Sequence, residues 1–301
     1  MYHVRLLNQR RQLETALMLK LMPPVGHPRG DELLRMAESH EGTLLGEMQA
    51  PLHVEQHELL EPHSEVAKSA FAFAENSRGN ILLDISSLPK RFFFLILQIL
   101  TMSDRVTNLA VSYAVPGRYD SERLQEDLQR PAYLPGFLPP TSRSSDAANT
   151  LVASVGFESA GLLQLFDDDL KRHVHLLVPS PSPPPSHRRI WQMVQDSVRA
   201  SSPETVLHHV SVRDVPAVYR KLVALGEEGG EAMLLAPYGP KTVSLAMALY
   251  TMTFGRQSSA IKYSQPKYYS PQYATGVGSY RGRDDSYVYV IKAHGRLLYG
   301  R

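Results

Sequence analysis

Apolar residues in the second half of the chain alternate between short runs and longer periodic stretches. LVASVGF (151–157) and EAMLLA (231–236) are aliphatic runs of strand length, whereas in residues 187–200 the apolar positions recur every three or four residues. Strands that alternate with helices of about 12 residues indicate right-handed crossovers and a mainly parallel sheet. We expect strands at 151–157, 173–178, 206–212 and 231–236 and in SSAIKYS and SYVYVIKA, and helices at 158–170, 187–200, 215–225 (closing on Gly226) and 240–253.

The first half of the chain follows the same order more loosely. Its expected strands are HVRLL, LMLKLM, HVEQHELL, ILLDIS and NLAVSYAV, and its clearest helices are 31–40 and 65–75. The loop after the first strand, NQRRQ, contains no glycine. We therefore predict a degenerate first half at 1–120, a connector at 121–148 that contains PAYLPGFLPPTSRSSD, and a second half at 149–301.

Two segments of the chain repeat one pattern. Residues 81–119 and 233–269 each contain an apolar strand, a loop ending in Pro-Lys, an apolar helix, a strand with a Tyr, and Pro-x-x-Tyr. This repeat predicts an α/β protein of two tandem Rossmann-like halves, doubly wound with mainly parallel sheets, that arose by internal duplication. Each half would present a cation at the mouth of its sheet. The matching residues are Lys90 and Lys241, Tyr113 and Tyr263, and Tyr119 and Tyr269.

Composition narrows the class of protein. A length of 301 residues accommodates two domains, and 43% hydrophobic with 21% charged residues is ordinary for a globular protein. A net charge of +2 excludes a globally basic nucleic-acid binder. No apolar run approaches the roughly 20 residues of a membrane span, and no secretory signal is recognised. Without Cys, thiol chemistry and thiolate metal sites are excluded. We expect a cytoplasmic protein that does not bind membranes.

The loops after the first and fourth strands of the second half are candidate ligand sites. Ligands of open parallel sheets bind beyond the carboxyl ends of the strands, where the crossovers diverge. A helix that begins there offers free N–H groups and a positive dipole end to a phosphate, and a lysine adds a mobile charge. The alternative is a tight strand–helix turn with a solvated lysine. The candidate ligand-binding residues are Gly156, Ser159, Gly239, Lys241 and Thr242.

The counterpart in the first half is the segment DISSLPKR (84–91). Its candidate ligand-binding residues are Ser86, Ser87 and Lys90. Asp84 either braces the loop, by a cap or an ion pair, or orients a ribose or a water. The two serines could equally cap the helix that begins at Pro89, a common role of serine.

Aromatic, imidazole and carboxylate groups supply the remaining candidates. Tyr119 and Tyr269 could stack on bases, or they could fill the space between two domains. His173 and His175 share a strand face but have no visible set of partner ligands, so we expect no metal and no cofactor. Catalysis would need a general acid or base, for which Asp84 and Glu158 are the carboxylates at predicted strand ends.

The loop Gly239-Pro240-Lys241-Thr242 resembles that of CARF-type Rossmann-like sensor domains of prokaryotic antiviral defence systems. In that family the loop after the fourth strand often reads Gly-Gly-Thr-Lys. Leu88-Pro89-Lys90 matches less well. The resemblance covers the order of elements in the second half and implies that two such domains meet to bind a cyclic oligoadenylate, so two fused halves would form a pseudo-dimer. No counterpart of the family's effector nuclease or winged-helix domain is recognised, which argues against a stand-alone sensor-effector.

Three hypotheses about function follow. The first is a nucleotide- or nucleic-acid-binding module, a sensor or subunit of a prokaryotic antiviral defence complex, with a nucleotide or oligonucleotide ligand and protein partner subunits. The second is a phosphodiesterase or nucleotide hydrolase on the same scaffold. The third is a non-catalytic adaptor subunit in a protein assembly.

Overall fold

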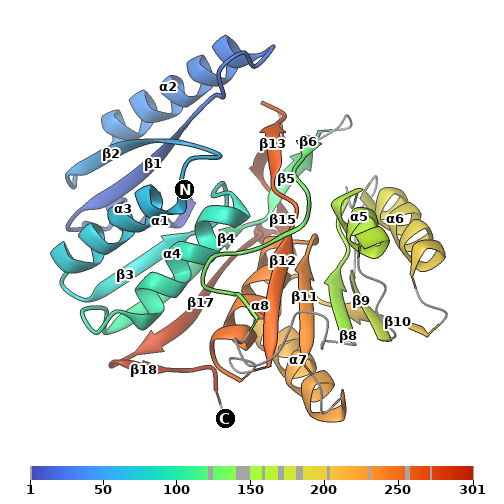
Figure 1. The fold of residues 1–301 in the computed structure, drawn as a ribbon. Helices are drawn as coiled ribbons and strands as arrows, with labels where there is room; N and C mark the ends of the chain where they lie inside the picture. Colours follow the sequence, from blue (N-terminus) through green and yellow to red (C-terminus); the bar gives the residue numbers. More distant parts are fainter. Residues whose placement is uncertain are drawn as a thin grey trace. The chain divides into compact units, whose positions relative to one another are not determined.

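The computed structural model describes residues 2–120, 125–139, 150–157, 160–168, 173–180, 186–201, 204–229, 232–254, 258–271 and 273–300. These residues form a mixed α/β protein with eight helices (Figure 1). The chain divides into two compact units, each built from two stretches of sequence. Unit 1 comprises Met1–Asp127 and Pro266–Leu298, and unit 2 comprises Leu128–Gln265 and Tyr299–Arg301.

Unit 2 contains a six-stranded sheet with the strand order β10-β9-β8-β11-β12-β7. The strands are β7 (Ala132–Tyr133), β8 (Thr150–Ser154), β9 (His173–Pro179), β10 (Thr205–Val210), β11 (Met233–Pro237) and β12 (Ser259–Tyr263). Strands β8 to β12 are parallel, and β7 is antiparallel to β12. If β8 to β12 are counted from one to five, the order is 3-2-1-4-5, and the direction of winding changes between β8 and β11.

The helices of unit 2 follow the strands in alternation. They are α5 (Ala160–Asp168), α6 (Ser186–Ala200), α7 (Val215–Gly229) and α8 (Lys241–Met252). All five residues of β8 and all five of β11 are buried, as expected for central strands covered on both faces. Helix α8 is apolar around its circumference and is buried from Thr242 to Thr251, which places it in the core.

Unit 1 contains two parallel strand pairs. β1 (Ala16–Met22) pairs with β2 (Leu52–Glu58), and β3 (Asn80–Asp84) pairs with β4 (Asn108–Ala114). β4 also takes the antiparallel strand β17 (Ser286–Ala293), to which β18 (Arg296–Leu297) is paired. The short strands are β5 (Pro116–Tyr119), β6 (Gln125–Leu128), β13 (Pro266–Tyr269), β14 (Ala274–Val277), β15 (Ser279–Tyr280) and β16 (Arg283–Asp284).

The helices of unit 1 are α1 (Tyr2–Gln9), α2 (Gly30–Glu47), α3 (His63–Asn76) and α4 (Lys90–Met102). α3 and α4 pack against each other (Figure 1). The core of this unit is built largely from α4, whose residues Phe92 to Leu97 are all buried. The rings of Phe93 and Phe94 stack with centroids 4.6 Å apart.

Two predicted elements differ in the structure. HVRLL, expected as a strand, lies in helix α1, where the buried Asn8 exchanges hydrogen bonds with Glu47 O and Gln49 N at 2.8 Å each; a short apolar run does not distinguish strand from helix. Helix α7 continues past Gly226 to Gly229. A Cβ on Gly226 would lie 2.3 Å from the Tyr250 hydroxyl, so this glycine permits helix packing and does not end the helix.

The course of the chain also differs from the predicted boundaries. Residues 266–298, placed with the second half, belong to unit 1 because β17 pairs with β4. The predicted connector contributes β7 to the sheet of unit 2 through its pairing with β12. The antiparallel strands β7 and β17 thus come from parts of the chain outside the alternating strands and helices of the sheets that they join. Among the residues described, no helix combines the length and apolarity needed to cross a membrane.

Candidate functional site

The loops that follow β8 and β11 meet at the carboxyl ends of these neighbouring strands. The backbone N–H of Gly239 donates to Oγ of the buried Ser154 at 2.9 Å. A Cβ on Gly156 would lie 2.4 Å from the carbonyl oxygen of Tyr238, and one on Gly239 would lie 2.9 Å from the carbonyl oxygen of Val155. Both predicted glycines are therefore required where the two loops pack directly against each other.

Helix α8 opens beside this contact. Pro240 precedes its first residue with φ −57° and ψ 150°, and Ser244 Oγ donates to the Pro240 carbonyl at 3.1 Å. Lys241 is partly exposed, whereas Thr242 is only 1% exposed and its Oγ1 has no hydrogen-bond partner among the residues described. Glu158 and Ser159, which the sequence also nominates, lie outside the described residues. A partly exposed cation and a buried hydroxyl are thus neighbours in the first turn of the helix.

The phenol of Tyr238 ties this loop to the end of β12. Its hydroxyl lies 2.9 Å from Ser264 Oγ and accepts the Ser264 N–H at 3.1 Å. Burial raises the pKa of Tyr238 to about 12 in spite of these hydrogen bonds. The phenol therefore stays neutral at physiological pH, and its contacts fix the loop.

The first-half loop is braced by its own hydrogen bonds. The Ser86 N–H donates to Asp84 Oδ1 at 2.8 Å, and Ser86 Oγ accepts the Ala114 N–H at 2.9 Å. Lys90 is buried at the first residue of α4, and Ser87 lines a cavity that Asp84 also borders. These contacts match the loop-bracing interpretation of Asp84, and a ligand role of Lys90 stays a prediction.

Two of the predicted tyrosines lie in one aromatic cluster of unit 1. The ring of Tyr273 makes edge contacts with Tyr119 and with Tyr269, with centroids 6.2 Å and 5.9 Å apart. Burial, followed by interactions with Tyr113, raises the pKa of Tyr119 well above its usual value. Burial also raises the pKa of Tyr113 to about 12. Tyr119 and Tyr113 are therefore uncharged at neutral pH, and the stacking of Tyr119 and Tyr269 on a base stays a prediction.

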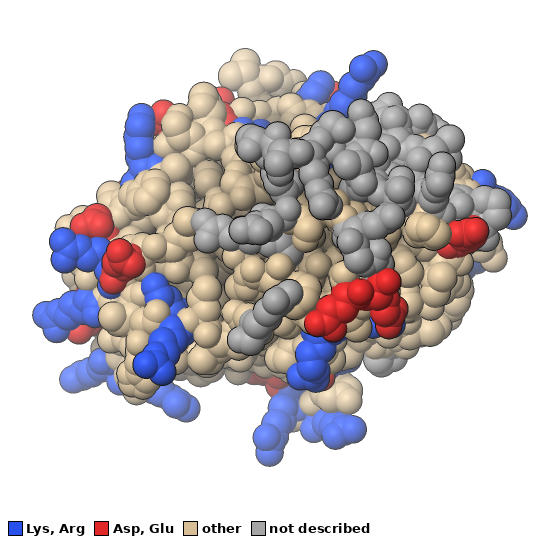
Figure 2. All heavy atoms as spheres, turned by 60° about the horizontal axis from the view of Figure 1, so that its bottom comes forward, with Lys and Arg blue, Asp and Glu red and all other residues tan. Residues whose placement is uncertain are grey.

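Charge is dispersed over the face of the protein drawn in Figure 2. On the face drawn in Figure 2, the Lys and Arg side chains of the described residues stand apart and are often close to Asp or Glu. Among the ion pairs of the described residues, Lys267 Nζ lies 2.8 Å from the carboxylate of Asp127. This face does not carry the continuous basic patch that binding along a nucleic-acid backbone needs.

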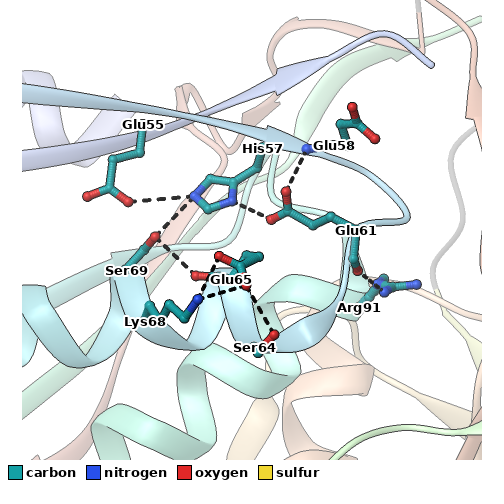
Figure 3. Close-up of polar contacts among 9 residues, drawn as sticks. All are labelled: Glu55, His57, Glu58, Glu61, Ser64, Glu65, Lys68, Ser69 and Arg91. Carbon is teal, nitrogen blue, oxygen red and sulfur yellow. Dashed lines mark hydrogen bonds and ion pairs between the residues drawn. The ribbon is translucent and has the colours of Figure 1, made fainter. Parts of the chain in front are cut away.

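A buried polar cluster in unit 1 joins β2, the turn after it and α3 (Figure 3). His57 Nε2 lies 3.1 Å from Ser69 Oγ, and its Nδ1 contacts the carboxylate of Glu61. The second carboxylate oxygen of Glu61 accepts the Glu58 N–H at 3.1 Å, and Arg91 donates to the Glu61 carbonyl. The sequence interpretation missed this cluster, because the spacing of its members follows no recognised motif.

The order serine–histidine–carboxylate is that of a hydrolytic triad, but the surroundings are those of a structural brace. Ser69 is 7% exposed and His57 is 5% exposed. Ser69 also lies in the interior of α3, where backbone N–H groups bond within the helix and cannot form an oxyanion hole. We therefore interpret the cluster as a polar connection between β2 and α3.

Replacing His57 with alanine is expected to destabilise unit 1 by about 1–3 kcal/mol, because buried oxygens of Glu61 and Ser69 lose their partner. Urea denaturation followed by circular dichroism measures this loss. His53→Ala, at an exposed position of the same strand, should leave the midpoint almost unchanged. Equal midpoints for the two variants would contradict the bracing role.

Two histidines contact each other across β9 and β10. His175 Nδ1 and His208 Nε2 are 2.9 Å apart, and the rings stack at 5.1 Å. Burial is the main cause that lowers the pKa of His208 to about 4, and the charges of Lys221 and His175 act in the same direction. Burial likewise lowers the pKa of His175. Among the described residues no group of three or more His, Asp or Glu side chains is placed to hold a metal ion.

This pair makes the stability of unit 2 dependent on pH. Below about pH 6.5 the unfolded chain takes up a proton on His208 that the folded chain accepts only near pH 4. The stability contribution is therefore complete above about pH 6.5 and is lost as the pH falls toward 4. His208→Gln should reduce this slope in urea melts at stepwise pH, whereas His209→Gln, exposed on the same strand, should retain it. Parallel slopes for the two variants would contradict the assignment.

No protein-family model matches this chain, and a search of curated proteins finds no match.

Proposed function

We propose that this protein binds a phosphate-bearing small ligand, such as a nucleotide, at the junction of β8 and β11 in unit 2. The observation that carries the proposal is the meeting of the loops after these strands at the point where the winding changes direction. In doubly wound sheets this is the place where ligands bind. Lys241 and the N–H groups of the first turn of α8 would hold the phosphate, and Thr242 would supply a hydroxyl.

The strand order supports a Rossmann-like fold for unit 2. The order 3-2-1-4-5 is that of the first five strands in the classic doubly wound order 3-2-1-4-5-6. In such sheets the phosphate approaches the start of a crossover helix, where backbone N–H groups are free and the dipole end is positive. α8 begins beside two loops that can pack against each other closely only because they contain glycine, and its dipole end there is positive.

Internal duplication is supported by matching local geometry in the two units. α4 and α8 each begin after a proline, with φ, ψ of −57°, 146° at Pro89 and −57°, 150° at Pro240. β4 and β12 are each followed by a short strand that begins with proline, β5 and β13. β4 and β12 also each take an antiparallel neighbour on the outer side, β17 and β7. By this correspondence Lys90 would have a role like that of Lys241.

The charge distribution favours a small ligand over a long nucleic acid. A net charge of +2, together with the separated basic side chains on the face drawn in Figure 2, provides little of the phosphate neutralisation that a duplex or a long single strand requires. A mononucleotide or a cyclic oligonucleotide needs only a few local contacts. A sensor or subunit of a cytoplasmic antiviral defence complex is one setting that fits such a ligand, and the loop resemblance is its only support.

The hydrolase alternative has weaker support. Of its two candidate carboxylates, Asp84 accepts a hydrogen bond that braces its loop, and Glu158 lies outside the described residues. A binding function needs no general acid or base, so it requires fewer specific residues at the site than hydrolysis does. Product analysis in the presence of any ligand found would identify turnover and so favour the hydrolase.

A thermal-shift screen tests the proposal. The purified chain is mixed with inorganic phosphate, mononucleotides, dinucleotides and cyclic oligoadenylates, and Trp191 fluorescence reports unit 2 because it is the only tryptophan and lies in α6. A ligand in hundredfold excess over its dissociation constant stabilises the folded state by about 2.7 kcal/mol. The shift should disappear in Lys241→Ala and persist in Arg199→Ala, an exposed cation of the same unit. No shift with any nucleotide would favour the adaptor.

A further inference from the structure

A cavity of about 360 Å³ lies inside unit 1 between β1 and β3. Residues 16–19 of β1 line one side of it and residues 80–84 of β3 line the other. Side chains of helices complete the wall, among them Leu44 from α2, Phe73 from α3 and Ile96 from α4. Successive side chains of a strand point to opposite faces of the sheet. A cavity that borders consecutive residues of β1 and of β3 therefore does not lie on one face, but runs along the edges of the two strands.

The edges of β1 and β3 that border the cavity have no neighbouring strand among the described residues. Within the described part of the chain, β1 pairs only with β2, and β3 pairs only with β4. Each strand therefore has one edge without a strand partner, and the cavity is bordered by both strands. A central parallel strand normally pairs on both sides, since unpaired backbone groups in the interior of a protein are costly.

Unit 2 shows the same arrangement with the space filled. There β8 lies between β9 and β11, pairs in parallel with both and precedes α5 in the chain. In chain order β9, β10, β11 and β12 correspond to β1, β2, β3 and β4, and α5 corresponds to α1. The place that β8 occupies in unit 2 is therefore the place of the cavity in unit 1.

We infer that the cavity between β1 and β3 is the docking site of one extended apolar peptide strand, parallel to both and joined to the amino end of α1 as β8 is joined to α5. The chemistry of the occupant follows from its surroundings. Apolar side chains from three different helices, Leu44, Phe73 and Ile96, line the cavity, so it suits a strand with apolar side chains like those of the fully buried β8. Its backbone would bond to the open edges of β1 and β3, which is the mode of strand addition. The inference does not depend on nucleotide binding.

The chain supplies its own probe strand. We would place the sequence TLVASVGF of residues 150–157 directly before Tyr2 and compare it with the same extension carrying proline at its second and fourth positions, which cannot pair on both sides. Hydrogen exchange measured by mass spectrometry should slow by about tenfold or more in residues 16–22 and 80–84 with the first extension only. The apparent melting temperature of unit 1 should rise in the same variant.

Equal exchange and equal melting of the two extended proteins would overturn the inference. Light scattering adds a second criterion, because a monomer supports a strand inserted within its own chain, whereas a dimer with protected strands would contradict the assignment to the amino end of α1. If the extended chain does not fold, the free peptide TLVASVGF is added to the unextended protein. Protection of the same two strands then supports the docking site, and its absence overturns it.

Discussion

Replacing Gly156 with alanine is expected to destabilise unit 2 by about 3 kcal/mol, the upper end of the usual cost of overpacking a core. The new methyl carbon would lie 2.4 Å from the Tyr238 carbonyl oxygen, a backbone atom held by the β11 loop. Neither loop can yield easily, because the Gly239 N–H is bonded to the buried Ser154 and the Tyr238 phenol is bonded to Ser264.

Trp191 fluorescence during urea denaturation measures this effect in unit 2. Gly42→Ala is the matched control, since nothing lies within 4 Å of the added carbon and the residue is inside helix α2. In a helix interior alanine is more favourable than glycine by roughly 0.5–1 kcal/mol, so circular dichroism should show no loss for this variant. A Gly156→Ala protein that unfolds at the wild-type urea concentration would show that the two loops are not tightly packed.

Replacing Phe93 with alanine is expected to cost unit 1 about 3–5 kcal/mol, the usual range for removing a buried phenylalanine ring. Phe93 is fully buried in α4 and stacks on Phe94. Because the side chain is completely buried, its removal leaves a cavity that the surrounding core can fill only in part.

Circular dichroism during urea denaturation measures this loss, and Phe71→Ala is the control because Phe71 is 54% exposed on α3. The control should change the unfolding free energy by less than about 0.5 kcal/mol, as is usual at surface positions. Similar losses in the two variants would mean that α4 is not the core of unit 1.

The sequence predicts the strands and helices of unit 2 well because the burial of each element determines the pattern of its apolar residues. The apolar runs around β8 and β11 are buried on all sides, and α8 begins within a residue of the predicted start. Gly226 was misread because the sequence does not show that Tyr250 packs against it. HVRLL was misread because five residues cannot reveal which period a short apolar run follows.

Long-range pairing could not be predicted from the sequence. The strand SYVYVIKA was expected correctly. Its pairing with β4 could not be, because that pairing depends on which sheet edge lacks a partner strand in the folded protein. The polar cluster of His57, Glu61 and Ser69 was missed for a similar reason, since its contacts arise from the packing of α3 against β2. In the candidate site, a ligand-binding role of Gly156 and Gly239 stays a prediction, and their contact with each other's loops emerged only from the fold.

The most direct test of the proposed binding site is hydrogen exchange measured with and without the nucleotide that gives the largest thermal shift. We expect slower exchange in residues 238–244, which include the first turn of α8, and in the loop after β8. The same ligand should produce no protection there in Lys241→Ala. Protection confined to other elements, or unchanged by Lys241→Ala, would contradict a ligand site at the junction of β8 and β11.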